Sequence, residues 1–312
     1  MQTLPLDAAQ AYPSLFDDPF RAEMESAPMR LLAFSNAGQP ALGLRLGQEI
    51  VNLTAEGLPS TLDELLRAGP AGLEAAARAG ATARTRVHLS DIAFLPPVIA
   101  PAKAIAVGLN FVDHVAESRF EPPKYPVLFH RYPSSWVGHG APLVRPRVST
   151  QFDYEGELLV VIGKAGRYID KTRALEHVAG FSVFNDGSIR DYQTKSAQWM
   201  MGKNFDRSGS FGPEFVTADE LPPGASGLRL QTRLNGQVLQ DANTRDMIFD
   251  VATLIAVCSE PFALEPGDII IAGTPSGVGA ARNPQIFMKA GDLCEVEIEG
   301  VGLLSNSIVD GD

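Results

Sequence analysis

Residues 152–163 read Phe-Asp-Tyr-Glu-Gly-Glu-Leu-Leu-Val-Val-Ile-Gly, an apolar run with two carboxylates immediately before it. The five apolar residues at 158–162 predict a short buried strand. Alternate strand residues point to the same face, so Glu155 and Glu157 are expected side by side, with Gly156 adding no bulk on the other face. Two like charges held this close require a cation.

A third carboxylate follows the next apolar run, at residues 178–184. The turn composition Asn185-Asp186-Gly187 is expected to place Asp186 at the end of a second strand. Three oxygen donors without a Cys partner suit one Mg²⁺ or Mn²⁺ ion per subunit. An acid at a strand end is more often a solvated charge, so the metal hypothesis needs support from neighbouring motifs.

The rest of the chain alternates short apolar runs with Gly and Pro turns, which predicts a mainly β or α+β fold with a large domain at residues 101–312. Strands are expected at residues 158–162, 180–184, 228–234, 268–272, 293–299 and 302–308. The best helix candidate is 246–258, because its apolar positions are spaced for one helical face.

Residues 29–95 are expected to form a small α+β N-terminal domain. Its predicted strands are residues 30–34, 41–46 and 49–53, and its predicted helices are 61–68 and 71–78. Three prolines within residues 96–101 mark the boundary, since Pro fixes an extended backbone and donates no ladder hydrogen bond. Residues 1–28 are expected to be an irregular extension or a short surface helix.

Composition and motifs exclude several classes of protein. A net charge of −11 over 312 residues argues against nucleic acid or an anionic membrane as a partner. The sequence contains no run long enough for a membrane span and no signal-peptide pattern, so we expect a cytoplasmic protein. Its two cysteines, Cys258 and Cys294, lie in apolar surroundings, so we expect them to be reduced thiols. A serine-hydrolase elbow, nucleotide-binding loops and the His-Glu-x-x-His motif are absent.

Several motifs in a fixed order resemble the fumarylacetoacetate hydrolase family, in its branch of bacterial acylpyruvate hydrolases and hydroxymuconate-type isomerases. They lie at residues 107–117, 154–158, 184–193, 202–206, 235–237, 243–249 and 266–279. The resemblance implies a distorted β-sandwich roll, a homodimer and a role in aromatic catabolism. It also raises Glu155, Glu157 and Asp186 from an acidic pattern to the expected metal ligands.

The same resemblance suggests the catalytic residues. His114 and Glu117 lie three apart and would share one face of a helical turn, so that the carboxylate orients the imidazole as a base. Lys203 and Gln193 are expected to stabilise the oxyanion or the departing enol. The segment 110–122 is expected to be a lid, mobile without ligand and helical when closed.

Substrate contacts are expected from three further regions. Gly273 and Thr274 lie in a Gly-rich turn that lines the site in the family, although the turn alone would be structural. Arg190 is a candidate for the substrate carboxylate, with an ion pair to Asp191 as the alternative. Where the family commonly has Phe-x-Lys-Pro, this chain has Phe-His-Arg-Tyr-Pro, so Arg131 and Tyr132 are expected to adjust specificity.

Together these features predict a metal-dependent hydrolase that cleaves the carbon–carbon bond of a 2,4-dioxo acid such as an acylpyruvate or fumarylpyruvate. The metal would stabilise an enolate while His114 activates water, so His114→Ala should lose hydrolysis but keep enolisation of oxaloacetate. The alternatives are an oxaloacetate decarboxylase or tautomerase, or a hydroxymuconate-type isomerase, on the same scaffold. A non-catalytic binding protein is a further alternative.

Overall fold

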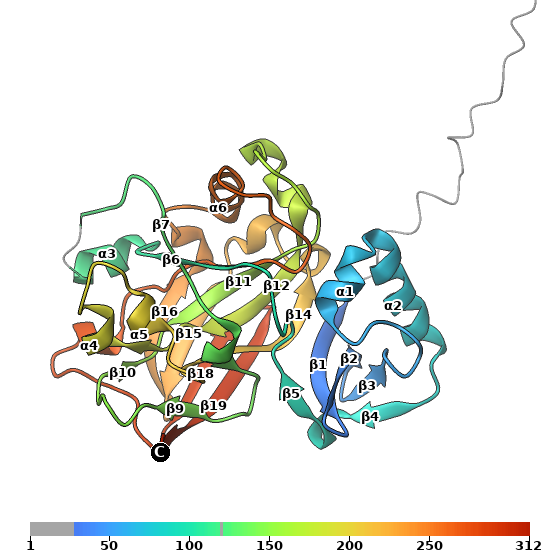
Figure 1. Ribbon diagram of the computed structural model, residues 1–312, viewed down its shortest axis with the longest axis horizontal. Coiled ribbons are helices and arrows are strands. Elements are labelled where there is room, and N and C mark those ends of the chain that lie inside the picture. The colour runs from blue at the N-terminus through green and yellow to red at the C-terminus, as the bar shows by residue number, and fades with distance from the viewer. Residues whose placement is uncertain (1–27, 119–120) are drawn as a thin grey trace, which may run out of the picture.

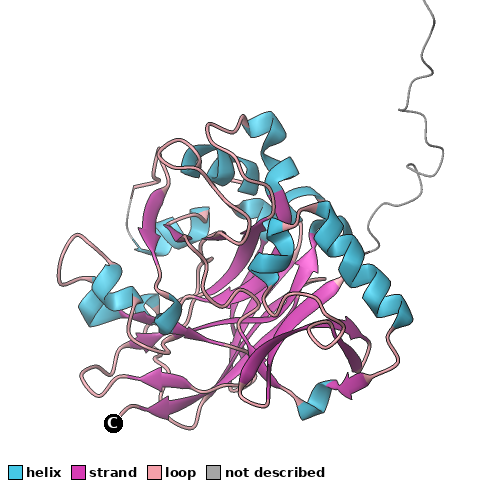
Figure 2. Ribbon diagram, turned by 45° about the vertical axis from the view of Figure 1, so that its right-hand side comes forward, coloured by secondary structure: helices cyan, strands magenta, loops and turns pink. Residues whose placement is uncertain are grey.

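The structure is a computed structural model, and it describes residues 28–118 and 121–312. The predicted extension at residues 1–28 lies outside the described residues except for its last position, and so do positions 119 and 120 of the predicted lid. In the described part, strands cross at the centre of the molecule and helices lie at its periphery (Figure 2). The mainly β prediction is therefore confirmed.

A large mixed sheet organises most of the described strands (Figure 1). Its order is β4 (Arg86–His88), β3 (Glu49–Asn52), β2 (Gln39–Leu46), β1 (Arg30–Asn36), β14 (Gly209–Thr217), β12 (Val178–Asn185), β11 (Gly156–Ile162), β17 (Ile269–Ile271), β6 (Ala104–Gly108) and β7 (Val127–His130). Off this path, β5 (Ala93–Leu95) pairs with β1, and β8 (Trp136–Val137) pairs with β14.

A second sheet packs across the first, and a short ribbon lies beside both. The second sheet has the order β16 (Gln237–Asn243), β15 (Arg229–Leu234), β18 (Leu293–Ile298), β19 (Gly302–Asp310) and β9 (Leu143–Arg145). The ribbon pairs β10 (Phe152–Asp153) with β13 (Ser188–Ile189). The α-helices are α1 (Leu62–Arg67), α2 (Pro70–Thr82), α3 (Val112–Ser118), α4 (Arg190–Gln193), α5 (Met200–Lys203) and α6 (Val251–Cys258).

Strand β11 is apolar throughout because both of its faces are covered. Leu158 and Val160 belong to a cluster that includes residues of the second sheet and of helix α6. Leu159 and Val161 belong to another cluster, formed with the N-terminal strands and helices α1 and α2. A strand buried on both faces has no polar alternation, which explains the continuous apolar run in the sequence.

The N-terminal strands continue the large sheet. Strand β1 pairs antiparallel with β14, with Leu31 opposite Phe215. In Figure 1 this N-terminal part, drawn in blue, lies at the right of the molecule, and β1 runs alongside β14. Residues 29–95 are thus hydrogen-bonded to the strands that follow residue 101.

A buried carboxylate forms ion pairs between the N-terminal strands and β14. Glu214 of β14 has a side chain only 1% exposed and forms ion pairs with Arg45 and with Arg30, the latter at 3.6 Å. Both arginines lie in N-terminal strands and are about 30% exposed. The carboxylate therefore links the two parts of the sheet through charge as well as through backbone hydrogen bonds.

Replacing Glu214 by Gln is expected to lower the free energy of unfolding by about 1–3 kcal/mol, because two arginines lose their buried partner but can still reach water. Urea denaturation measures this loss. Glu49→Gln is the matched control, since Glu49 pairs with Arg86 at the surface and should cost below about 1 kcal/mol. Equal effects of the two variants would show that Glu214 does not stabilise the contact between the N-terminal strands and β14.

One predicted helix begins later than its pattern indicates. The apolar spacing predicted a helix over 246–258, but α6 spans Val251–Cys258 and Asp250 caps it by accepting from the Thr253 N–H. The residues before it form a 3-10 turn at Thr244–Asp246 and then a bend, which Asn110 holds because its carbonyl accepts from Ile248 and its side chain accepts from Phe249. These tertiary hydrogen bonds outweigh the helical pattern.

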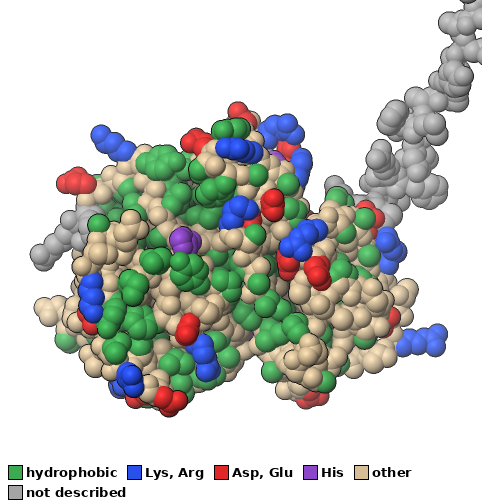
Figure 3. All heavy atoms as spheres, in the orientation of Figure 1, with side chains coloured by type: hydrophobic (Ala, Val, Ile, Leu, Met, Phe, Trp, Pro, Cys, Tyr) green, Lys and Arg blue, Asp and Glu red, His purple; other side chains and the backbone are tan. Residues whose placement is uncertain are grey.

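The described residues include no helix long and apolar enough to span a bilayer. Both cysteines are free and buried, as predicted. Burial raises the pKa of each thiol to about 12, which keeps both in the unreactive thiol form at neutral pH. On the face shown in Figure 3, acidic and basic side chains are scattered among apolar ones rather than gathered into a basic patch.

Candidate active site

The three predicted metal ligands lie together at the end of the central strands. One carboxylate oxygen from each of Glu155, Glu157 and Asp186 lies within 4.8 Å of the others. All three residues are at most 3% exposed. Three convergent, buried oxygen donors form an arrangement that a hard divalent cation can occupy.

Local hydrogen bonds fix these ligands. Glu155 directly precedes β11, and its N–H donates to the side chain of Asn185 while its carbonyl accepts from the Asp186 N–H. Gly156 separates the two glutamates because a Cβ there would lie 2.3 Å from the Thr232 hydroxyl of the second sheet. The close packing of the two sheets thus requires the glycine between the two glutamates.

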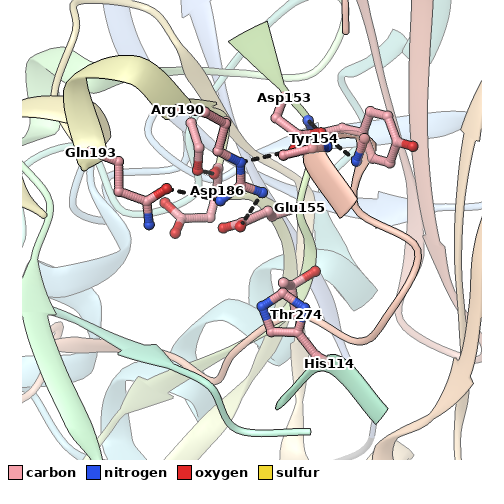
Figure 4. Close-up of polar contacts among 12 residues, drawn as sticks. His114, Asp153, Tyr154, Glu155, Asp186, Arg190, Gln193 and Thr274 are labelled. Atoms are coloured by element: carbon pink, nitrogen blue, oxygen red, sulfur yellow. Dashed lines mark hydrogen bonds and ion pairs between the residues drawn. The ribbon is translucent and has the colours of Figure 1, made fainter. Parts of the chain in front are cut away.

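Three cations surround the carboxylates. Lys203 forms an ion pair with Glu155 and another with Asp186, the latter at 2.6 Å. Arg190 lies 2.6 Å from the other oxygen of Glu155, and Arg131 pairs with the second oxygen of Asp186. In Figure 4, Arg190 lies between Asp153 and Gln193, with Glu155 beside its guanidinium.

The two glutamates differ in their charge environment. Burial opposes ionisation of Glu155, but the positive charges of Arg190 and Lys203 outweigh it and hold its pKa well below the usual range. For Glu157, burial and the neighbouring charges of Asp186 and Glu155 raise the pKa well above its usual range. Its carboxylate accepts the Gly273 N–H at 2.5 Å. A divalent cation would relieve this repulsion, so the donor set fits Mg²⁺ or Mn²⁺.

The predicted His–Glu dyad is present on helix α3. His114 Nδ1 lies 2.9 Å from a carboxylate oxygen of Glu117, and His114 is 7% exposed. Glu117 also accepts the Gly277 N–H at 2.9 Å and 3.1 Å through its two oxygens. A carboxylate at Nδ1 favours the tautomer whose Nε2 accepts a proton. Helix α3 (Val112–Ser118) lies within the segment 110–122 that the sequence predicts to be a lid.

The carboxylate triad and the His114–Glu117 dyad both line one cavity of about 390 Å³. The predicted site residues that line it are His114, Glu117, Glu155, Glu157, Asp186, Arg190, Gln193, Lys203 and Thr274. Segments from β6, the start of β11, the β12 turn, α4, α5 and the turn after β17 therefore meet at one place. Such a convergence of carboxylates, cations and a His–Glu pair is suited to moving protons next to a bound anion.

Arg131 and Tyr132 do not line this cavity, although we expected them to contact the substrate. The Arg131 side chain is 0% exposed, and its donors are taken up by Asp186, the Gly187 carbonyl and Ser135. Tyr132 is 45% exposed and lies in a separate groove. The geometry assigns Arg131 to holding Asp186, because a buried guanidinium needs a nearby carboxylate.

The structure gives the hydrogen-bond and ion-pair partners of Arg190, Thr274 and Gly273, which the sequence could not show. Arg190 pairs with Asp153 at 2.8 Å and with Glu155, whereas Asp191, the alternative partner, accepts from Ser149. The Thr274 hydroxyl donates to the Gly156 carbonyl, which leaves it able to accept only. Gly273 lies outside the cavity lining and contributes its N–H to Glu157.

Sequence reasoning missed two buried positioning residues. Asp153 accepts the N–H groups of Gly279 and Ala280 and also bonds Arg190, and burial raises its pKa although Arg190 opposes the shift. Gln240 donates to Thr274 and accepts from the Gly156 N–H. Asp153 lies two residues before Glu155, so the same spacing could have identified it. Gln240 carries no sequence signal.

Comparison with known proteins places the chain in a family. Residues 103–309 match the family model described as fumarylacetoacetate (FAA) hydrolase C-terminal. The chain therefore belongs to the fumarylacetoacetate hydrolase family, as its motifs predicted.

Individual relatives carry different activities in their names. "Oxaloacetate tautomerase FAHD2A, mitochondrial" of Homo sapiens is 41% identical over 292 residues, covering 91% of this chain and 93% of that protein. A putative HpcE protein from Mycobacterium smegmatis is 35% identical with a TM-score of 0.81. Maleylpyruvate hydrolase from Sphingobium sp. SYK-6, in complex with manganese (II) and pyruvate, is 28% identical with a TM-score of 0.77. Each structure covers 91% of this chain and is itself fully covered.

Proposed function

We propose that this protein is a divalent-metal-dependent tautomerase that interconverts the keto and enol forms of oxaloacetate or a closely related 2-oxo acid. The observation that carries the proposal is the buried Glu155–Glu157–Asp186 triad facing one cavity with the His114–Glu117 dyad. Carbon–carbon hydrolysis was the first expectation from the sequence. The 41% identical tautomerase supports the alternative more strongly.

The residues of the cavity supply what a tautomerase needs. A cation held by the three carboxylates would act as a Lewis acid toward the carboxylate and 2-oxo oxygens of the substrate. His114, with Nδ1 held by Glu117, would take the proton from C3 through Nε2 and return it in the reverse direction. Lys203 and Arg190 would place positive charge beside the enolate, and Gln193 offers an amide at the cavity wall.

The direct test follows the ultraviolet absorbance of enol-oxaloacetate after it is mixed with the protein. We expect Mg²⁺ or Mn²⁺ to speed the decay to the keto form well above the rate with metal alone, and a chelator to abolish the difference. Calorimetric titration with each metal should show one saturable site per chain. A protein that binds metal but leaves the decay unchanged would refute the tautomerase proposal.

Hydrolysis of an acylpyruvate is the second candidate, because the same His–Glu dyad can serve it. A dyad that can deprotonate carbon can also deprotonate a water that attacks a carbonyl. The structural similarity to maleylpyruvate hydrolase supports the same candidate. Pyruvate release from acylpyruvates and fumarylpyruvate, measured with a coupled assay, would identify hydrolysis.

We further propose a homodimer that acts on a small anionic 2-oxo acid in the cytoplasm, without nucleic acid or membrane as partner. The dimer rests on the resemblance to the family, and the excluded partners rest on the net charge of −11. The human relative named above is described as mitochondrial, so the compartment is tested separately by cell fractionation. Light scattering on the purified protein gives its mass in solution.

A further inference from the structure

An aromatic wall begins directly beside the catalytic lysine. Lys203 Nζ lies 5.2 Å from the centroid of the Phe129 ring. Phe129 in turn contacts Trp199 edge to face, with ring centroids 5.7 Å apart. Trp199 precedes helix α5, the same short helix that ends at Lys203, and both aromatic residues line the cavity. The wall is therefore built onto the elements that position the polar groups.

The backbone of β6 leaves room for the indole. A Cβ on Gly108, the last residue of β6, would lie 2.2 Å from Cζ3 and 2.8 Å from Cη2 of Trp199. Any side chain at this position would displace the indole. Gly108 and its neighbours Val107 and Leu109 also line the cavity, so they extend the apolar surface next to Trp199.

The proposed reaction on oxaloacetate gives this wall no role. The carboxylate and 2-oxo groups of the substrate are served by the triad, Lys203 and Arg190. The remaining part of oxaloacetate is a second carboxylate, which gains nothing from contact with indole and phenyl rings. An apolar planar group gains by removing its surface from water and by packing edge to face.

We propose that Trp199 and Phe129 form a subsite for an apolar substituent on C3 of a 2-oxo acid, with Trp199 as its specificity-determining residue. Arylpyruvates such as phenylpyruvate are then further substrates. The inference rests on the proposed tautomerase function. In the reaction the C3–H bond breaks, a proton is gained by the 2-oxo oxygen, and the C=O double bond is replaced by C2=C3. The step needs no oxidant or second reactant.

Binding is tested with oxamate and N-phenyloxamate, which share one head group and contain no enolisable carbon. With Mg²⁺ present, wild type is expected to bind N-phenyloxamate roughly tenfold more tightly or better. Trp199→Ala should remove most of that preference while changing oxamate affinity by less than about twofold. The chain has two tryptophans, so Trp199 is the sole indole in the variant Trp136→Phe. Binding of N-phenyloxamate to this variant should change the fluorescence of Trp199.

A second variant gives an independent measurement. Gly108→Ala keeps the indole in the chain but pushes it from its place, so it should also reduce the preference for N-phenyloxamate. Calorimetry on both variants avoids dependence on the Trp136 background. Equal affinity of wild type for the two ligands, or an equal loss of both in Trp199→Ala, would overturn the subsite.

Turnover separates this inference from the function on which it rests. Wild type is expected to tautomerise phenylpyruvate as well as oxaloacetate, and Trp199→Ala to lose kcat/KM for phenylpyruvate selectively. Turnover of oxaloacetate without turnover of phenylpyruvate would refute the further substrates and leave the proposed function intact. Selective binding of N-phenyloxamate with no turnover of either acid would refute the tautomerase and retain the subsite.

Discussion

Glu157→Gln is expected to abolish saturable Mg²⁺ and Mn²⁺ binding without weakening the fold. Glu157 lies beside the carboxylates of Glu155 and Asp186, and its own oxygen accepts the Gly273 N–H. The amide keeps the volume and the acceptor but removes one of three adjacent negative charges. Metal affinity should fall by more than about 100-fold, and the rate by about three orders of magnitude through the loss of several kcal/mol of Lewis-acid stabilisation.

The stability of Glu157→Gln without metal shows whether the substitution acts on the metal site alone. Its free energy of unfolding should equal or exceed that of wild type, because like-charge repulsion is relieved. Glu155→Gln should also lose metal, but at a cost in stability, since Lys203 and Arg190 each lose an ion pair. Glu176→Gln, at an exposed pair with Arg173, should change neither property. Normal metal binding by Glu157→Gln would remove the triad as the metal site.

The sequence predicted best those elements whose signal is local. Strand β11 was identified because both of its faces are buried, which leaves a continuous apolar run. Glu155 and Glu157 were recognised as a pair because strand geometry alone sets their spacing. His114 and Glu117 were recognised for the same reason, since three positions on a helix bring them together.

The structure differs from the sequence predictions, or adds to them, where a residue's partners are distant in the chain. Arg131 was assigned to substrate because its partner, Asp186, lies 55 residues later and the fold alone brings them together. The start of α6 was misplaced because Asn110, far upstream, holds the residues before it. Gln240 reaches Thr274 from the second sheet, a contact that no pattern in the sequence signals.

The relation between the two parts of the chain was also hidden. The prolines near residue 97 indicated a boundary, and the N-terminal strands do form a compact group. The pairing of β1 with β14, however, joins strands that lie far apart in the sequence, with Leu31 opposite Phe215. The pairing of such distant strands depends on tertiary packing. The proline-rich composition could therefore indicate the boundary near residue 97, but it could not show that both parts share one sheet.

His114→Ala is expected to lower kcat for oxaloacetate tautomerisation by 10²–10⁴-fold, the usual contribution of a general base. Metal affinity should stay within about threefold, because His114 lies outside the triad. Exchange of the C3 protons of oxaloacetate with deuterated solvent, followed by NMR, should slow in parallel with kcat. His88→Ala, at an exposed histidine away from the cavity, should change the rate by less than about twofold.

Substitutions of Glu117 distinguish its two effects on His114, which are orientation of the ring and negative charge beside it. Glu117→Gln keeps an acceptor for His114 Nδ1–H and for the Gly277 N–H, so its loss in kcat should be smaller than that of His114→Ala, about tenfold to a hundredfold. Glu117→Ala frees both partners and should approach the His114→Ala rate while speeding amide exchange at Gly277. If His114→Ala instead keeps tautomerisation and loses only pyruvate release from acylpyruvates, the dyad activates water, and hydrolysis replaces tautomerisation as the function.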